Sequence, residues 1–482
     1  MAGSDSRLRT ALDSLPFGEE NAVAGRVTKE LPQGVTSGML YRDVVRIAWP
    51  SFVELMLTQL ASMVDLMMVG SLGAWALTAV GLTTQPKFLL MTVFQSMNVG
   101  ATALVARYKG ADNPQKANLV VRQAVLLTLV LSVIASVLGY IFAEPMIRFM
   151  GATDAQSLEG GTVYLQIQML GFVFMALTTT VTAVLRGVGD SRTAMIYNLV
   201  ANLVNVVFNY LLIYGRLGFP RMGVAGASLA TIIGQFVAFL AALVCILRGR
   251  GYLRLEFREG FKPDREMLGN IFNIGLPAMI EQLLMRAGMI IYAKTVATLG
   301  TVPFATHQVC MNIQALSFMN GQAFAVSATT LMGQSLGRRR PDMAQAYCSR
   351  TRRVGMFIAV AIGLSFIFLG RQMVSLYNSD PQIVELGGRV LLLVAVMQPL
   401  QSSQFIIAGA LRGAGDTRAT AVITFITVLI VRPVSAIILV QGLHWGLEGA
   451  WIAMVLDQVL RSVLVLARYQ GGKWKTIRLK NS

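Results

Sequence analysis

Two carboxylates interrupt the first long apolar stretch of the chain. Glu54 and Asp65 lie eleven residues apart, so at about 100° per residue they fall within roughly 20° of one another on a helix. Thr58 and Ser62 lie close to the same line. Because carboxylates inside a membrane normally face a bundle interior or a wet cavity, this stripe predicts a site that holds a proton or a small cation. A hydrogen-bonded carboxyl with a purely structural role is the alternative.

A second polar stripe consists of four asparagines. Asn198, Asn202, Asn205 and Asn209 recur at i, i+4, i+7 and i+11, which lines four carboxamides along one side of a helix. Amide oxygens can coordinate a cation, and amide groups can hydrogen-bond a carboxyl that gains and loses a proton. Asparagines also hold helices together in lipid, and the residues alone leave both roles open.

The elements that position these stripes are membrane helices. Apolar residues make up 55% of the chain and charged residues 13%, and the mean hydropathy is +0.60, which excludes an ordinary soluble domain. An apolar run of about 20 residues can cross the bilayer as a helix. We count about twelve such runs, near 44–69, 78–106, 120–142, 162–185, 193–214, 224–248, 268–298, 303–333, 353–370, 388–411, 419–440 and 446–467.

An internal repeat divides these runs into two sets. Residues 185–194 read LRGVGDSRTA and residues 411–420 read LRGAGDTRAT, 226 positions apart, while Pro50 to Glu54 and Pro277 to Glu281 are 227 apart. This constant register indicates duplication. Six spans per copy is an even number, so both copies enter the membrane from the same side.

The predicted fold is therefore an all-α polytopic membrane protein with twelve transmembrane helices in two pseudo-symmetric six-helix bundles. Its predicted parts are a cytoplasmic N-terminal tail (1–43), an N-lobe (44–247), a cytoplasmic linker (248–267), a C-lobe (268–467) and a cytoplasmic C-terminal tail (468–482).

The net charge of +17 is distributed unevenly along the chain. Most arginines and lysines follow the even-numbered spans, as at Arg338 to Arg340 after span eight. This asymmetry is typical of cytoplasmic loops, so it predicts two cytoplasmic termini in a multi-pass protein of the plasma or inner membrane. It also accounts for the basic charge without nucleic-acid binding.

The second copy keeps only part of the chemistry of the first. Glu281 repeats Glu54, but the counterpart of Asp65 is Tyr292, and the counterpart of the asparagine stripe contains Arg432 followed by a proline. A buried arginine repels a nearby small cation. The N-lobe is therefore the better candidate for a cation site. Arg286 is expected to neutralise Glu281 or to pair with another helix.

Several motifs together resemble the multidrug and toxic compound extrusion (MATE) transporters. They are Pro50 with Asp65 fifteen residues later and then MMVG at residues 67–70, the LRGVGD and LRGAGD pair, VNVVFNYLLIYG from Val204, GVAGASLAT from Gly223 and ATHQV from Ala305. The resemblance implies two six-helix lobes around a V-shaped cleft, and export of drugs or metabolites in exchange for inward H⁺ or Na⁺.

The resemblance also implies the site residues. Its N-lobe cation site corresponds to Asp65, Tyr164, Asn205, Asn209 and Thr231. Asn209 is similar to the NorM-type branch, but the acidic pair that this branch has in its C-lobe is replaced here by Met285 and Gln401. No metal is expected apart from Na⁺ at Asp65. The substrate-cleft candidates are Glu54, Glu281, Arg286 and Gln401.

The expected function is secondary active antiport that exports small organic, cationic compounds by alternating access of the two lobes. H⁺ or Na⁺ would be the coupling ion, no cofactor is needed, and a monomer in the lipid bilayer is expected. The alternatives are a lipid-linked precursor flippase or another two-bundle transporter. An intramembrane enzyme is a third alternative, which the lack of a nucleophile–base cluster disfavours.

Overall fold

The computed structural model describes residues 27, 31–152, 154–249 and 251–477, and these form helices joined by short turns. Most of the predicted N-terminal tail and residues 478–482 of the predicted C-terminal tail lie outside this part. The first half contains α2 (Ser37–Gly70), α3 (Ala74–Gly110), α4 (Pro114–Ile141), α5 (Ala143–Phe149), α6 (Ala155–Leu170), α7 (Phe172–Gly187), α8 (Ser191–Tyr214) and α9 (Val224–Arg248).

The second half repeats this order. It contains α10 (Arg265–Ala297), α11 (Thr301–Gly337), α12 (Pro341–Ser375), α13 (Pro381–Ala414), α14 (Thr417–Thr424), the π-helical η3 (Phe425–Val431), α15 (Arg432–Ile437), the π-helical η4 (Ile438–Gly442) and α16 (Gly446–Gln470). Short 3-10 helices, η2 (Phe257–Glu259) and η5 (Lys473–Thr476), lie in the linker and after α16.

Twelve of these segments are long enough to cross a membrane. Ten are long and apolar, and α6 with α7 forms an eleventh that is bent by 54°. The twelfth is α11, which has the same 37 residues as its repeat α3, or about 55 Å of helix. Its apolar character is diluted by buried polar side chains such as His307, Gln314 and Asn320. The predicted all-α fold with twelve spans is confirmed.

The LRGVGD and LRGAGD motifs are tight links between consecutive helices. Gly189 and Gly415 both have a positive φ, of 89° and 88°, which glycine adopts without the steric cost of a Cβ. The aspartate that follows is the N-cap residue of α8 or α14. The Asp190 side chain accepts a hydrogen bond from the Thr193 backbone N–H at 3.2 Å, a favourable way to begin a helix.

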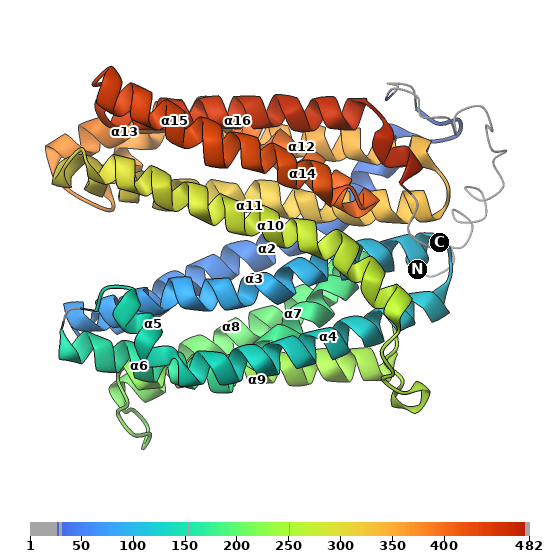
Figure 1. Cartoon of the computed structure of the whole chain (residues 1–482), viewed down its shortest axis with the longest axis horizontal. Helices are drawn as coiled ribbons and strands as arrows, with labels where there is room; N and C mark the ends of the chain where they lie inside the picture. Colours follow the sequence, from blue (N-terminus) through green and yellow to red (C-terminus); the bar gives the residue numbers. More distant parts are fainter. Residues whose placement is uncertain (1–26, 28–30, 153, 250, 478–482) are drawn as a thin grey trace.

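The two lobes meet closely near the end of the molecule where α2 begins and α16 ends, and they diverge toward the other end (Figure 1). A Cβ at Gly110 of α3 would collide with the carbonyl oxygen of Gln334, and one at Gly337 of α11 with that of Arg107. The Thr330 hydroxyl also donates to the Arg186 carbonyl at 2.8 Å. Both repeats therefore use a glycine to bring the lobes together at this end.

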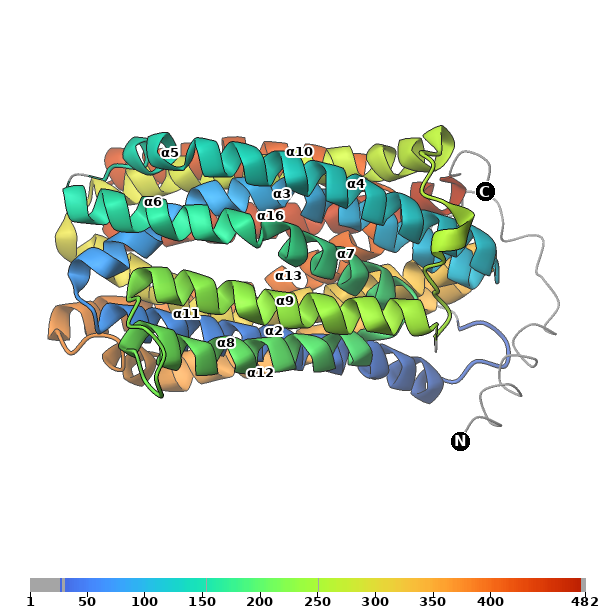
Figure 2. The same cartoon turned by 90° about the horizontal axis from the view of Figure 1, so that it is seen from below.

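The inter-lobe linker is attached to the N-lobe. The Gln123 side chain on α4 donates to the Lys262 carbonyl at 2.9 Å and accepts from the Asp264 backbone N–H at 3.0 Å. Arg122 forms an ion pair with Glu259. The view from below looks onto this lobe, where α6 and α7 follow one another between α4 and α9 (Figure 2).

Candidate functional site

The structure brings Asp65 together with the inner two asparagines of the polar stripe. The Asn205 amide donates to Asp65 Oδ2 at 2.9 Å, and the Asn209 amide donates to Oδ1. Asp65 lies on α2 and both asparagines on α8, so this site depends on the packing of these two helices. Each carboxylate oxygen therefore has its own amide donor.

The carbonyl oxygens of the same two carboxamides are buried without a hydrogen-bond partner among the described residues. A buried acceptor without a partner is costly, and it often marks a place where a water or an ion binds. The carboxylate of Asp65 and these two amide oxygens are hard oxygen donors of the kind that bind Na⁺. The residues present therefore fit a small cation.

Two more predicted site residues, Tyr164 and Thr231, connect further helices to this site. Tyr164 on α6 is close enough to Asp65 for an electrostatic interaction, and its side chain is hydrogen-bonded to Thr231 on α9. The Thr231 hydroxyl also donates to the Ala227 carbonyl at 3.1 Å within α9. The five residues that the resemblance selected thus come from four helices of one lobe, with Thr231 linked to Asp65 through Tyr164.

Lys87 is a neighbour of this site that the sequence analysis missed. It lies on α3 directly after Pro86 and interacts electrostatically with Asp65. A lysine within an apolar run is itself a signal, because ionisable residues inside membrane helices are rare and usually have a partner. The site therefore combines one carboxylate, one ammonium group and two carboxamides.

Glu54 belongs to a separate cluster on the same face of α2. Arg186 Nη2 lies 2.8 Å from Glu54 Oε2, which is an ion pair between α7 and α2. The Asn198 amide donates to Glu54 Oε1 at 2.8 Å. Asn202 instead donates to the Thr58 hydroxyl at 2.9 Å. The asparagine stripe therefore serves three different partners along α2.

Glu281 has the same arrangement in the C-lobe. It forms an ion pair with Arg412 at 3.1 Å and accepts hydrogen bonds from Thr420 at 3.1 Å and Thr424 at 3.3 Å. Each repeat thus joins its glutamate to the arginine of its LRG motif, a pairing that the sequence analysis did not find. The sequence contained a signal for this pairing, because the two glutamates are 227 residues apart and the two arginines 226 residues apart.

Of the two expectations for Arg286, pairing with Glu281 is wrong, because Arg412 pairs with Glu281; the alternative, a contact with another helix, is found. The Arg286 guanidinium instead lies 3.4 Å from the centroid of the Phe88 ring on α3, which is a cation–π contact between the two lobes. Gln401 is the remaining C-lobe candidate, and Met285 is the other residue at the position of a missing acid. Gln401 is buried on α13 and its amide oxygen has no partner among the described residues, while Met285 is only partly buried.

A third charged cluster occupies the interior of the C-lobe. Asp457 on α16 is fully buried and accepts from Arg432 Nε at 3.0 Å and from Arg461 at 2.6 Å. Tyr292, the counterpart of Asp65, donates to the Ala450 carbonyl at 2.8 Å. Arg432 directly follows the π-helical segment η3. In the N-lobe two carboxamides bind Asp65, whereas in the C-lobe two arginines bind Asp457.

An all-helical chain of twelve spans in two repeated bundles, with polar clusters inside each bundle, has the architecture of a secondary transporter. The MatE family model matches residues 50–211 and 277–438, one match in each repeat. The chain belongs to this family of multidrug and toxic compound extrusion transporters, and it is a transporter rather than an enzyme.

Known proteins similar to this chain agree with that assignment. The chain is 28% identical over 435 residues to the probable multidrug resistance protein NorM of Thermotoga maritima, covering 90% of this chain and 93% of that protein. It is 26% identical to the multidrug resistance protein MdtK of Yersinia pestis, covering 89% of this chain and 94% of that protein.

Solved structures show the same fold. An outward-facing multidrug resistance MATE transporter of the MOP superfamily superposes with a TM-score of 0.83 at 23% identity, covering 92% of this chain and 100% of that one. A MATE structure in a bent conformation gives a TM-score of 0.82 at 23% identity, covering 92% of this chain and 97% of that one.

Proposed function

We propose that this transporter is a secondary active antiporter that exports small organic, cationic compounds and takes in H⁺ or Na⁺ at Asp65. The observation that carries the proposal is the difference among four carboxylates deep within the spanning helices. Glu54, Glu281 and Asp457 each have an arginine partner, whereas Asp65 is held by the amides of Asn205 and Asn209.

An arginine ion pair holds a carboxylate in its charged form, because removing the charge leaves the arginine uncompensated. Among the described residues Asp65 has no ion-pair partner, and Lys87 interacts with it only electrostatically. It can take up a proton, or it can bind Na⁺ together with the unpartnered oxygens of Asn205 and Asn209. An organic cation would compete with either ion for the same carboxylate, which couples export of one to uptake of the other.

The direction of exchange follows from the proposed orientation. The basic residues after the even-numbered spans support cytoplasmic termini in a plasma or inner membrane. A cation then enters with the membrane potential, which contributes about 2.3 kcal/mol per charge per 100 mV. Ion binding drives transport only if its affinity differs between the two lobe arrangements. We propose that residues 44–247 and 268–467 are the lobes that move, within a monomer.

Reconstitution into liposomes tests this function. The purified protein should move a fluorescent organic cation when an H⁺ gradient or a Na⁺ gradient is imposed alone, and the gradient that works identifies the coupling ion. Liposomes without protein, and an ionophore that collapses each gradient, are the controls. Uptake that is insensitive to both gradients would contradict antiport.

A further inference from the structure

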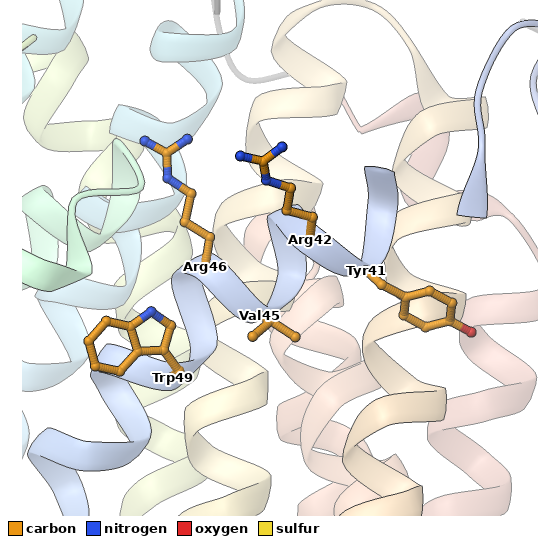
Figure 3. Close-up of a pocket in the computed structure, with 5 residues that line it drawn as sticks. All are labelled: Tyr41, Arg42, Val45, Arg46 and Trp49. Carbon is orange, nitrogen blue, oxygen red and sulfur yellow. The ribbon is translucent and has the colours of Figure 1, made fainter. Parts of the chain in front are cut away.

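A basic and aromatic patch lies near the start of α2, far along this helix from Asp65. Tyr41, Arg42, Val45, Arg46 and Trp49 line a shallow pocket there, and we call these five residues the α2 patch. These residues share one face of the helix, and Figure 3 shows the two guanidinium groups reaching upward with Val45 and Trp49 below them. The patch therefore has a charged half and an apolar half.

The charge of the α2 patch is not compensated within the described residues. Neither Arg42 nor Arg46 forms an ion pair there, and the neighbouring acid Asp43 instead accepts a hydrogen bond from the Tyr347 hydroxyl at 2.7 Å. A third arginine, Arg350, lies 5.8 Å from the centroid of the Tyr41 ring and adds positive charge. The patch is therefore suited to an anionic group.

The same helix shows that the patch faces outward. Leu40, Val44 and Ile47 are buried in a core with C-lobe residues, whereas Val45 and Trp49 are each 43% exposed. In a membrane protein such exposed apolar surface contacts lipid. Tryptophan prefers the boundary between hydrocarbon and headgroups, and arginine extends its charge toward the headgroups.

We propose that the α2 patch binds the headgroup of an anionic phospholipid, with Arg42 and Arg46 on the phosphate and Val45 and Trp49 along the first part of the acyl chains. The orientation proposed above places this lipid in the cytoplasmic leaflet, where anionic lipids attract basic residues next to membrane helices. The bound lipid would hold the first turns of the helix that carries Glu54 and Asp65.

Native mass spectrometry of the full-length protein, titrated with phosphatidylglycerol, tests the site. The variant Arg42→Gln/Arg46→Gln should bind the tightest phosphatidylglycerol about thirty-fold more weakly than the wild type, or about fivefold for each arginine. The variant Arg42→Lys/Arg46→Lys should keep most of the affinity, and phosphatidylcholine should not be retained by the wild type.

The matched control is Arg338→Gln/Arg339→Gln, which removes the same charge from exposed residues between α11 and α12. It should change the affinity less than twofold. Equal weakening by both double variants, or no weakening by Arg42→Gln/Arg46→Gln, would overturn the proposal. Circular dichroism and the unfolding temperature check that each variant is folded.

The sequence before α2 is of mixed charge and includes Glu19 and Glu20, so the experiment also tests whether these two acids compete with lipid for the patch. If Glu19→Gln/Glu20→Gln in the full chain tightened phosphatidylglycerol binding, the patch would belong to the chain's own N-terminal residues and the proposal would be wrong. These measurements read lipid binding in the absence of any ion gradient, so their failure is distinct from a failure of antiport.

Discussion

The two lobes have the same arrangement of helices, but equivalent positions in them carry side chains of different chemistry. In the N-lobe, Asp65 is held by two carboxamides whose oxygens have no partner. In the C-lobe, Tyr292 takes that position, and the buried acid Asp457 lies between two arginines. Duplication supplied two bundles of the same fold, and under the proposed function their difference separates a carboxylate whose charge changes from one whose charge is fixed by arginines.

The two lobes have the same ion pair between a glutamate and the arginine of an LRG motif. Glu54 with Arg186 and Glu281 with Arg412 are equivalent ion pairs that join the first helix of each lobe to its LRG motif. Because buried pairs of this kind cost desolvation energy when formed and more when broken, their presence in both lobes indicates a shared structural role. We therefore expect these pairs to stabilise the fold, and the proposed ion coupling is left to Asp65.

Stability measurements should give the largest contrast between the lobes. Asp457→Asn leaves two buried arginines without their acid, so the free energy of unfolding should fall by about 3–5 kcal/mol. Asp65→Asn should cost much less, because an amide can hydrogen-bond to the neighbouring carboxamides. Denaturant unfolding in detergent measures both. Equal losses would remove the distinction between a fixed and a changeable charge.

A smaller loss of stability, equal in the two lobes, is expected at the two glycines that bring the lobes together. Gly110→Ala and Gly337→Ala each place a Cβ against a carbonyl oxygen of the opposite lobe, which should cost about 1–3 kcal/mol. Gly81→Ala is the matched control, since a Cβ there meets nothing within 4 Å. Unfolding temperatures measure all three, and an effect confined to one of the two glycines would argue against a symmetric contact.

Within the N-lobe the inner and outer asparagines should differ. Asn209→Ala removes a donor to Asp65 and should weaken coupling-ion affinity about tenfold, since a hydrogen bond to a charged group contributes about 1.5 kcal/mol. Asn202→Ala removes only the bond to Thr58 and should change the affinity less than twofold. The half-saturating ion concentration for export measures both, and the reverse order would relocate the site along α8.

The smallest effect should come from Lys87. Lys87→Met removes a positive charge near Asp65 and should tighten Na⁺ binding about fivefold, corresponding to roughly 1 kcal/mol between two charges in a wet site. Calorimetric titration with NaCl measures this change, and Lys294→Met, near the end of α10, is the control. Weaker Na⁺ binding in Lys87→Met would mean that the lysine supports the ion instead of repelling it.

The sequence predicted correctly those features that the residues of a single helix determine. Hydropathy located the spans, and the helical period placed Asn205 and Asn209 on one side of one helix. The true start of α2 at Ser37 was missed, because hydropathy marks the part of a helix in hydrocarbon and not its cap. The helical period also gave no indication of the π-helical segments before and after α15.

Contacts between helices were harder to predict. Glu54 with Arg186, and Lys87 with Asp65, join different helices, and their meeting depends on how each helix is rotated in the bundle. Arg286 illustrates the error, because proximity along the chain suggested Glu281 while packing placed it against Phe88 of the other lobe. The family resemblance was more useful here, since it selected Tyr164 and Thr231 from two further helices.

The central claim is that Asp65 is the carboxylate that exchanges the coupling ion, and gradient-driven export in proteoliposomes tests it most directly. Asp65→Asn should reduce export of an organic cation to the level of protein-free liposomes, while Asp112→Asn, the same change at an exposed turn residue, should leave it unaltered. Wild-type export rates in Asp65→Asn, with the variant folded and inserted, would contradict the account.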